Sequence, residues 1–168
     1  LSFSQFIESN NNSVKTSWKK ATTNSVQSSF SDTVDMQKIG VIGTRPEGFD
    51  TCDYDSVEVK DKLNVSLIEF DLDDLFEESR NVNDSTIAAT KKRIASYLEG
   101  TQELEQDEFD KSISIYHGLD SLKEKHTLDA FAIRCWPETF TEYGCASCGP
   151  MAMMNEKKVS CACEADVL

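Results

Sequence analysis

Hydrophobic residues recur along the first 35 positions at spacings of four or multiples of four. They are Val14, Trp18, Val26, Phe30 and Val34, set among serine, asparagine and threonine, with no glycine or proline. This spacing places the side chains on one side of a helix, so it predicts an amphipathic helix that needs a surface to lie against. We interpret residues 1–36 as a helical linker or the tail of a preceding domain.

After Met36 the pattern changes to short β-prone runs separated by helical stretches. Strands are predicted where hydrophobic residues follow one another closely, at Lys38–Gly43, Val65–Leu72, Asp129–Trp136 and Val159–Cys163. Helices are predicted at Tyr54–Leu63, at Asp84–Leu98, at Asp107–Lys125 with a break near Gly118, and between Pro150 and Asn155.

This alternation predicts an α/β fold. Strands that are separated by helices pair in parallel through right-handed crossovers. We therefore expect a three-layer, flavodoxin- or Rossmann-like open parallel sheet over residues 37–168, preceded by the N-terminal linker helix. Because Leu168 follows directly after a strand with no helix to cover it, we also expect the domain to be truncated at its C-terminal end.

The charge of the chain argues against two classes of partner. Its 168 residues include 17 Lys and Arg against 30 Asp and Glu, a formal charge of −13. Such a surface repels phosphates and anionic headgroups, so neither nucleic acid nor membrane is an expected partner. No hydrophobic run approaches the roughly 20 residues that cross a bilayer, and no export signal opens the chain, so we expect a cytoplasmic protein.

Five of the six cysteines lie in the last 34 residues. Cys145 and Cys148 stand at CxxC spacing and Cys161 and Cys163 at CxC spacing, which is compatible with four thiolates on a structural Zn²⁺. One reading is therefore a non-catalytic α/β interaction module with a four-cysteine zinc site. The other is that the thiols are free, because Cys161 and Cys163 share one face of an apolar strand, where buried free cysteine is common.

Carboxylates follow the last two predicted strands, with Glu138 after the third and Glu164 and Asp166 after the fourth. Ligands of open parallel sheets collect beyond the carboxyl ends of the strands. If these strands are neighbours, Glu138 and Asp166 face one crevice and offer hard oxygen ligands to Mn²⁺ or Mg²⁺. The alternative is that all three are solvated loop acids, which are common in a chain with 30 acidic residues.

The loop Gly43–Phe49 follows the first predicted strand and contains Arg45. It matches neither GxGxxG nor GxxxxGK[ST], so nucleotide binding is unsupported. Arg45 is a candidate substrate-binding residue, with a solvated arginine at the sheet edge as the alternative. His117 and His126 stand in polar helical surroundings and are expected at the surface.

Three segments together resemble the L-fucose isomerase-like proteins and, more distantly, L-fucose and L-arabinose isomerases. They are Ile39–Phe49 (IGVIGTRPEGF), Ala132–Glu138 (AIRCWPE) and Cys163–Leu168 (CEADVL). The first looks like the start of the second N-terminal domain of that family. The resemblance covers residues 37–168, and the order and separation of the segments carry it.

The resemblance implies a metal-dependent aldose–ketose isomerase that usually uses Mn²⁺. Glu138 then matches a metal ligand that also acts as acid or base, and Asp166 a ligand that anchors the ion. The remaining ligand in the family is a histidine of a C-terminal domain, which neither His117 nor His126 matches. The chain would be the middle domain of a longer homo-oligomeric enzyme acting on a monosaccharide, with the N- and C-terminal domains of the same enzyme as partners, and inactive alone.

Overall fold

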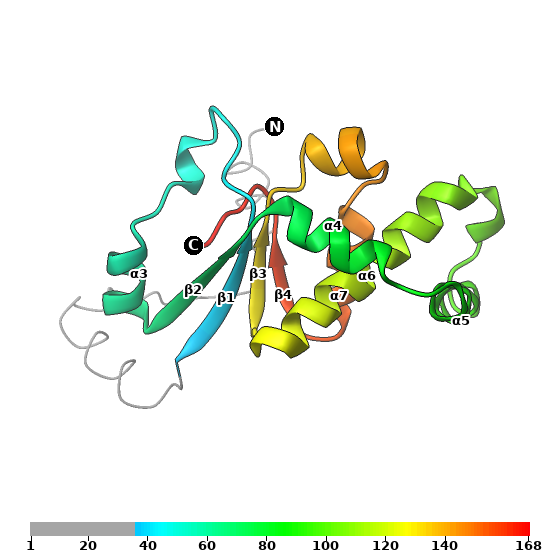
Figure 1. Cartoon of the computed structure of the whole chain (residues 1–168), viewed down its shortest axis with the longest axis horizontal. Helices are drawn as coiled ribbons and strands as arrows, with labels where there is room; N and C mark the ends of the chain where they lie inside the picture. Colours follow the sequence, from blue (N-terminus) through cyan, green and yellow to red (C-terminus); the bar gives the residue numbers. More distant parts are fainter. Residues whose placement is uncertain (1–35) are drawn as a thin grey trace, which may run out of the picture. The chain divides into compact units, whose positions relative to one another are not determined.

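A computed structural model describes residues 36–168, and the helix predicted within residues 1–36 falls almost wholly outside them (Figure 1). The strands are β1 (Gln37–Ile42), β2 (Val65–Phe70), β3 (Ala130–Ile133) and β4 (Ser160–Ala162). The α-helices are α3 (Ser56–Leu63), α4 (Leu72–Arg80), α5 (Asp84–Ala95), α6 (Gln106–His126) and α7 (Cys148–Glu156). Shorter helical turns span Asp50–Cys52, Thr101–Glu103 and Thr139–Tyr143.

The four strands form one open sheet in the order β2-β1-β3-β4, and every pair is parallel. In its register Ile42 lies opposite Phe70 of β2 and Ile133 of β3. The predicted α/β class and parallel sheet are therefore confirmed. The arrangement also settles that β3 and β4 are neighbours, as a shared crevice after them requires.

The chain changes direction across the sheet after β2. The first crossover leads from β1 to β2 on one side, and the later ones lead to β3 and β4 on the other. Right-handed crossovers in opposite directions put their helices on opposite faces, so α3 covers one face and α4, α6 and α7 the other. The carboxyl ends of β1 and β3 meet where the order reverses, the place at which open α/β sheets bind ligands.

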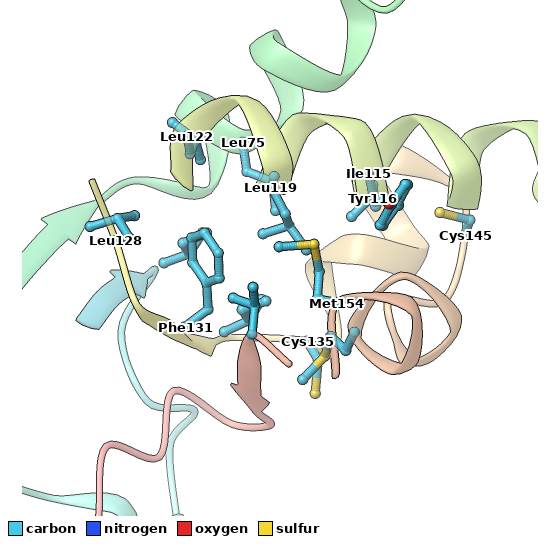
Figure 2. Close-up of a cluster of buried hydrophobic side chains, with 14 residues drawn as sticks. Leu75, Ile115, Tyr116, Leu119, Leu122, Leu128, Phe131, Cys135, Cys145 and Met154 are labelled. Atoms are coloured by element: carbon cyan, nitrogen blue, oxygen red, sulfur yellow. The ribbon is translucent and has the colours of Figure 1, made fainter. Parts of the chain in front are cut away.

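The main hydrophobic core lies between the sheet and the helices α4, α6 and α7 (Figure 2). Phe131 of β3 and Leu119 of α6 are almost fully buried there, and Met154 of α7 closes the side nearest β4. Cys135 and Cys145 also belong to this cluster (Figure 2). Because Cys135 is the second residue after β3, its burial in the core holds the start of the loop that follows this strand.

The second face of the sheet has a smaller cluster, formed by Val41, Ala132 and Ala165. Ala165 comes after β4, and its backbone N–H donates to the carbonyl of Ile133 at 3.0 Å. The C-terminal segment therefore turns back across the end of β3, and it runs over the sheet in Figure 1. Glu164 and Ala165 make this turn in the left-handed region, with φ of 57° and 53°.

Several bounds are shorter than predicted, since β3 ends at Ile133 and α5 at Ala95, and two further differences concern the elements themselves. Leu72 begins helix α4 and does not end strand β2, because the backbone N–H of Asp71 donates to the Asp74 carboxylate at 2.8 Å and caps a new helix. Helix α6 runs without a break through Gly118, which is buried against Ser79 of α4. In residues 36–168, no helix combines the length and hydropathy that a membrane span requires.

Candidate site at the ends of β1, β3 and β4

Arg134 is the first residue after β3, and it links the loops that follow β1 and β3. Its Nε donates to Glu138 Oε2 at 2.7 Å and its Nη2 to Glu138 Oε1 at 2.6 Å. Its Nη1 donates to the carbonyl oxygen of Thr44 at 3.2 Å. The side chains of Arg134 and Glu138 are 21% and 22% exposed. The pair therefore orients Glu138 where the strand order reverses.

This ion pair also sets the charge of Glu138. The hydrogen bonds from Arg134 lower the pKa of the Glu138 carboxyl more than its partial burial raises it. Glu138 is accordingly a carboxylate at neutral pH, as a metal ligand must be. Both of its oxygens are engaged by Arg134, so a cation here would share the carboxylate with the guanidinium or displace it.

Glu164 lies between Cys163 and Ala165 in the loop after β4. Its Oε1 accepts a hydrogen bond from the Cys135 thiol at 3.3 Å. Its Oε2 is buried and has no hydrogen-bond partner within the described part of the chain. A buried carboxylate oxygen without a donor is costly, and a cation or a water molecule would satisfy it.

Asp166, the other predicted ligand, follows two residues later and is partly buried. Its Oδ1 accepts from the backbone N–H of Leu168 at 3.2 Å, and its own N–H donates to the carbonyl of Cys163 at 3.0 Å. Asp166 and Glu138 thus follow neighbouring parallel strands at the same end of the sheet. Across residues 36–168, no three His, Cys, Asp or Glu side chains are gathered closely enough to hold a metal ion among themselves.

Arg45 lines a hollow of about 600 Å³ beside the ends of β1 and β2. Its Nη1 lies 3.1 Å from Asp50 Oδ1, and its Nε lies 3.4 Å from Asp53 Oδ1. Among the described residues that line the hollow are one positive side chain, that of Arg45, and four carboxylates, those of Asp53, Glu69, Asp71 and Asp74. Arg45 is therefore half-buried and paired with acids on its own loop.

The four cysteines of the zinc alternative have different surroundings. Cys145 is buried, Cys161 is partly buried, and Cys148 and Cys163 are exposed. Burial raises the pKa of Cys145, with Ser112 and Lys111 of α6 beside it. Burial also raises the pKa of Cys161 in β4 to about 12. The four-cysteine zinc site remains a prediction.

Neither Arg134 nor Cys135 was predicted from the sequence as a site residue. The pairing of Arg134 with Glu138 depends on the turn after β3. An arginine and a glutamate four positions apart form an ion pair only when the backbone between them turns. The contact between Cys135 and Glu164 depends on the order of the strands. The acids on β2 and α4 were also missed, because α4 itself was not predicted.

Taken together, these features define an open, parallel α/β domain with carboxylates at the carboxyl ends of adjacent strands. No protein-family model matches the chain. Among characterised proteins, it is similar to sulfoquinovose isomerases, as the following comparisons show.

The sulfoquinovose isomerase of Clostridium sp. (strain MSTE9) is 26% identical over 130 residues, covering 77% of this chain and 29% of that protein. The enzyme of Priestia megaterium is 28% identical over 134 residues, covering 77% and 29%. That of Alkalicoccus urumqiensis is 29% identical over 147 residues, covering 81% and 31%. The chain is thus a distant relative of a sugar isomerase and spans less than a third of the length of these relatives.

Proposed function

We propose that this chain is a domain of a metal-dependent aldose–ketose isomerase of the L-fucose and L-arabinose type, to which it supplies Glu138 and Asp166 as metal ligands. One observation carries the proposal: in a relative of sugar isomerases, these two carboxylates follow the neighbouring parallel strands β3 and β4. The Thr44 contact of Arg134 places Glu138 beside the reversal of strand order, where such sheets bind ligands.

The residues at this end of the sheet suit a hard divalent cation. Glu138 is held ionised by Arg134, and carboxylate oxygens are the ligands that Mn²⁺ and Mg²⁺ prefer. The buried Oε2 of Glu164, which has no partner among the described residues, adds a third acceptor to the same loops. Two or three oxygens leave a site incomplete, so a further ligand would come from another part of the enzyme, for which the family resemblance implies a histidine.

A divalent cation bound here would stabilise the negative charge that develops on two sugar oxygens while a proton moves between C1 and C2. Asp166, held by the backbone of its own loop, would anchor the ion. Because Arg134 lowers the pKa of Glu138, this side chain is ionised and available as a metal ligand. We also assign it the acid or base role in the proton transfer that the family resemblance implies.

The substrate class that fits the hollow beside β1 and β2 is a hydroxyl-rich monosaccharide. Its four carboxylates can accept hydrogen bonds from sugar hydroxyls, and Arg45 is the one positive side chain among the described residues that line it, able to donate to a sugar oxygen. The relatives are named for sulfoquinovose. We propose a sugar substrate for the whole enzyme, with a homo-oligomeric assembly, further domains of the same enzyme as partners, and a cytoplasmic location.

Titration of the chain with Mn²⁺, followed by the electron paramagnetic resonance signal of the free ion, tests the metal ligands. We expect Glu138→Gln and Asp166→Asn each to weaken Mn²⁺ binding by at least about tenfold, since each removes an anionic ligand. Glu156→Gln, at an exposed position of α7, is the matched control and should leave binding unchanged.

Equal binding by wild type and both variants would contradict the proposal. The same experiment with Zn²⁺ examines the alternative, a non-catalytic interaction module. One tightly held Zn²⁺ that protects the thiols of Cys145, Cys148, Cys161 and Cys163 from alkylation would favour that module.

A further inference from the structure

Two cysteines outside the proposed metal ligands lie together at the ends of β3 and β4. Cys135 is the second residue after β3, and Cys163 directly follows β4. The two strands are neighbours, and the hydrogen bond from the N–H of Ala165 to the carbonyl of Ile133 holds their loops together. The fold therefore juxtaposes two thiols that are 28 positions apart in the sequence.

The surroundings of the two thiols differ. Cys135 is 6% exposed and lies at the edge of the main core (Figure 2), whereas Cys163 is exposed to solvent. The Cys135 thiol donates to Glu164 Oε1 at 3.3 Å, and Glu164 is the residue that directly follows Cys163 in the chain. One thiol is thus accessible to a reagent and the other is held next to it.

We propose that Cys135 and Cys163 are a redox pair that forms a reversible intramolecular disulfide when the protein meets a hydroperoxide. This inference is independent of the proposed isomerase function. Disulfides of this kind in reducing compartments are usually transient and regulatory.

The oxidation of the two thiols proceeds in two steps. The Cys163 sulfur attacks the peroxide, the O–O bond breaks, and hydrogen peroxide is reduced to water as Cys163 becomes a sulfenic acid. The Cys135 sulfur then attacks the Cys163 sulfur, so that an S–S bond forms and the S–O bond breaks. The leaving hydroxyl takes the thiol proton and departs as a second water molecule. The two sulfurs together lose two electrons, which the peroxide gains.

The environments fix the order of these steps. Cys135 is only 6% exposed, so an oxidant in solution does not reach this thiol first. Cys163 is accessible and reacts first, and Cys135 resolves the sulfenic acid because it is already adjacent. Cys161, two residues before Cys163, is partly buried in the main core and contacts the carbonyl of Val159.

Disulfide formation changes the site in two ways. Cys135 loses the hydrogen that it donates to Glu164 Oε1, so this oxygen loses its contact, and the buried Oε2 beside it already has no partner among the described residues. The bond also joins the loop that carries Glu138 to the loop that carries Asp166. Oxidation would therefore link the loops after β3 and β4 covalently, next to the two proposed metal ligands.

The test is a thiol map of the chain after exposure to stoichiometric hydrogen peroxide, alkylation of the remaining thiols, and tryptic digestion. We expect two of the six thiols to be lost. Residues 135–157 and 159–168 should be recovered as one linked peptide, with tandem fragmentation assigning the bond to Cys135 and Cys163. A reductant should restore the six thiols.

Three variants keep the test decisive. Cys163→Ser changes an exposed residue and should abolish the linked peptide, while Cys135→Ser should leave a sulfenic acid at Cys163 that dimedone traps. Cys161→Ser is the matched control and should retain the bond. A bond from Cys163 to Cys161 or Cys148, or an unchanged count of six thiols, would overturn the proposal.

Discussion

Arg134 and Glu138 form a partly exposed ion pair, in which the guanidinium donates to both oxygens of the carboxylate. Both hydrogen bonds are charge-assisted and bidentate, the arrangement in which arginine binds carboxylates most firmly. The contact to Thr44 extends the pair to the loop after β1. Arg134 thus joins the loops after β1 and β3 and also keeps the proposed ligand Glu138 ionised.

A double-mutant cycle of Arg134→Gln and Glu138→Gln should give a coupling free energy of about 1 kcal/mol at pH 7, near the upper end for accessible pairs. Because the pKa of Glu138 is lowered in the folded state, this contribution is present above the ordinary carboxyl pKa. It is lost as the pH falls through the lowered value.

Urea unfolding of the four proteins at neutral and acidic pH measures this coupling. A coupling that vanishes in acid would agree with the account. A coupling that is absent at pH 7, or that grows as the pH falls, would show that the ion pair does not set the charge of Glu138.

The residues at the strand ends were predictable only in part. The positions of Glu138 and Asp166 followed from the general rule for parallel sheets, and β3 and β4 are indeed neighbours. The side chains that engage the acids did not follow from it. The contacts of Arg134 and Cys135 depend on how each loop turns, which hydrophobic periodicity does not record.

At the scale of elements, the packing of α4 against α6 depends on a glycine. A Cβ added at Gly118 would lie 2.3 Å from the Ser79 hydroxyl oxygen and 3.1 Å from the Ser79 backbone nitrogen. The same glycine made a break in α6 plausible from the sequence. The structure shows that α6 continues through Gly118. The glycine has no side chain, so the backbone of α6 can approach the backbone of α4 closely at this point.

Gly118→Ala should lower the free energy of unfolding by roughly 1–3 kcal/mol, because the overpacked site cannot yield at the Ser79 backbone. Adding Ser79→Ala should restore part of the loss by removing the nearer atom. Gly149→Ala in α7 is the control, since nothing lies within 4 Å of its added Cβ. Thermal or urea unfolding measures all three, and equal stability of the Gly118 and Gly149 variants would contradict the close-packing account.

The elements themselves were largely predictable, with one instructive exception. Short runs of closely spaced hydrophobic residues predicted all four strands. Most of the helices between the strands were predicted from the spacing of their hydrophobic residues and from their capping residues. Helix α4 was missed because Leu72 extends the apolar run of β2. Its start is set by the local hydrogen bond between Asp71 and Asp74, and its buried face by Leu75, Phe76 and Ser79.

At the scale of the whole molecule, the acidic composition raises the question of where on the surface a divalent cation binds. A charge of −13 attracts divalent cations to many places on the surface, so binding alone does not locate a site. The proposal is specific because it names the ends of β3 and β4. The hollow beside β1 and β2, with its four carboxylates, is the natural competitor within the described residues.

The most direct test is therefore to locate bound Mn²⁺ by paramagnetic broadening of the backbone amide signals of the chain at substoichiometric ion. The account predicts that signals of residues 135–139 and 163–167 weaken first, and that Glu138→Gln or Asp166→Asn removes this effect. Strongest broadening at residues 69–74, or uniform broadening over the acidic surface, would contradict the assignment of Glu138 and Asp166 as metal ligands.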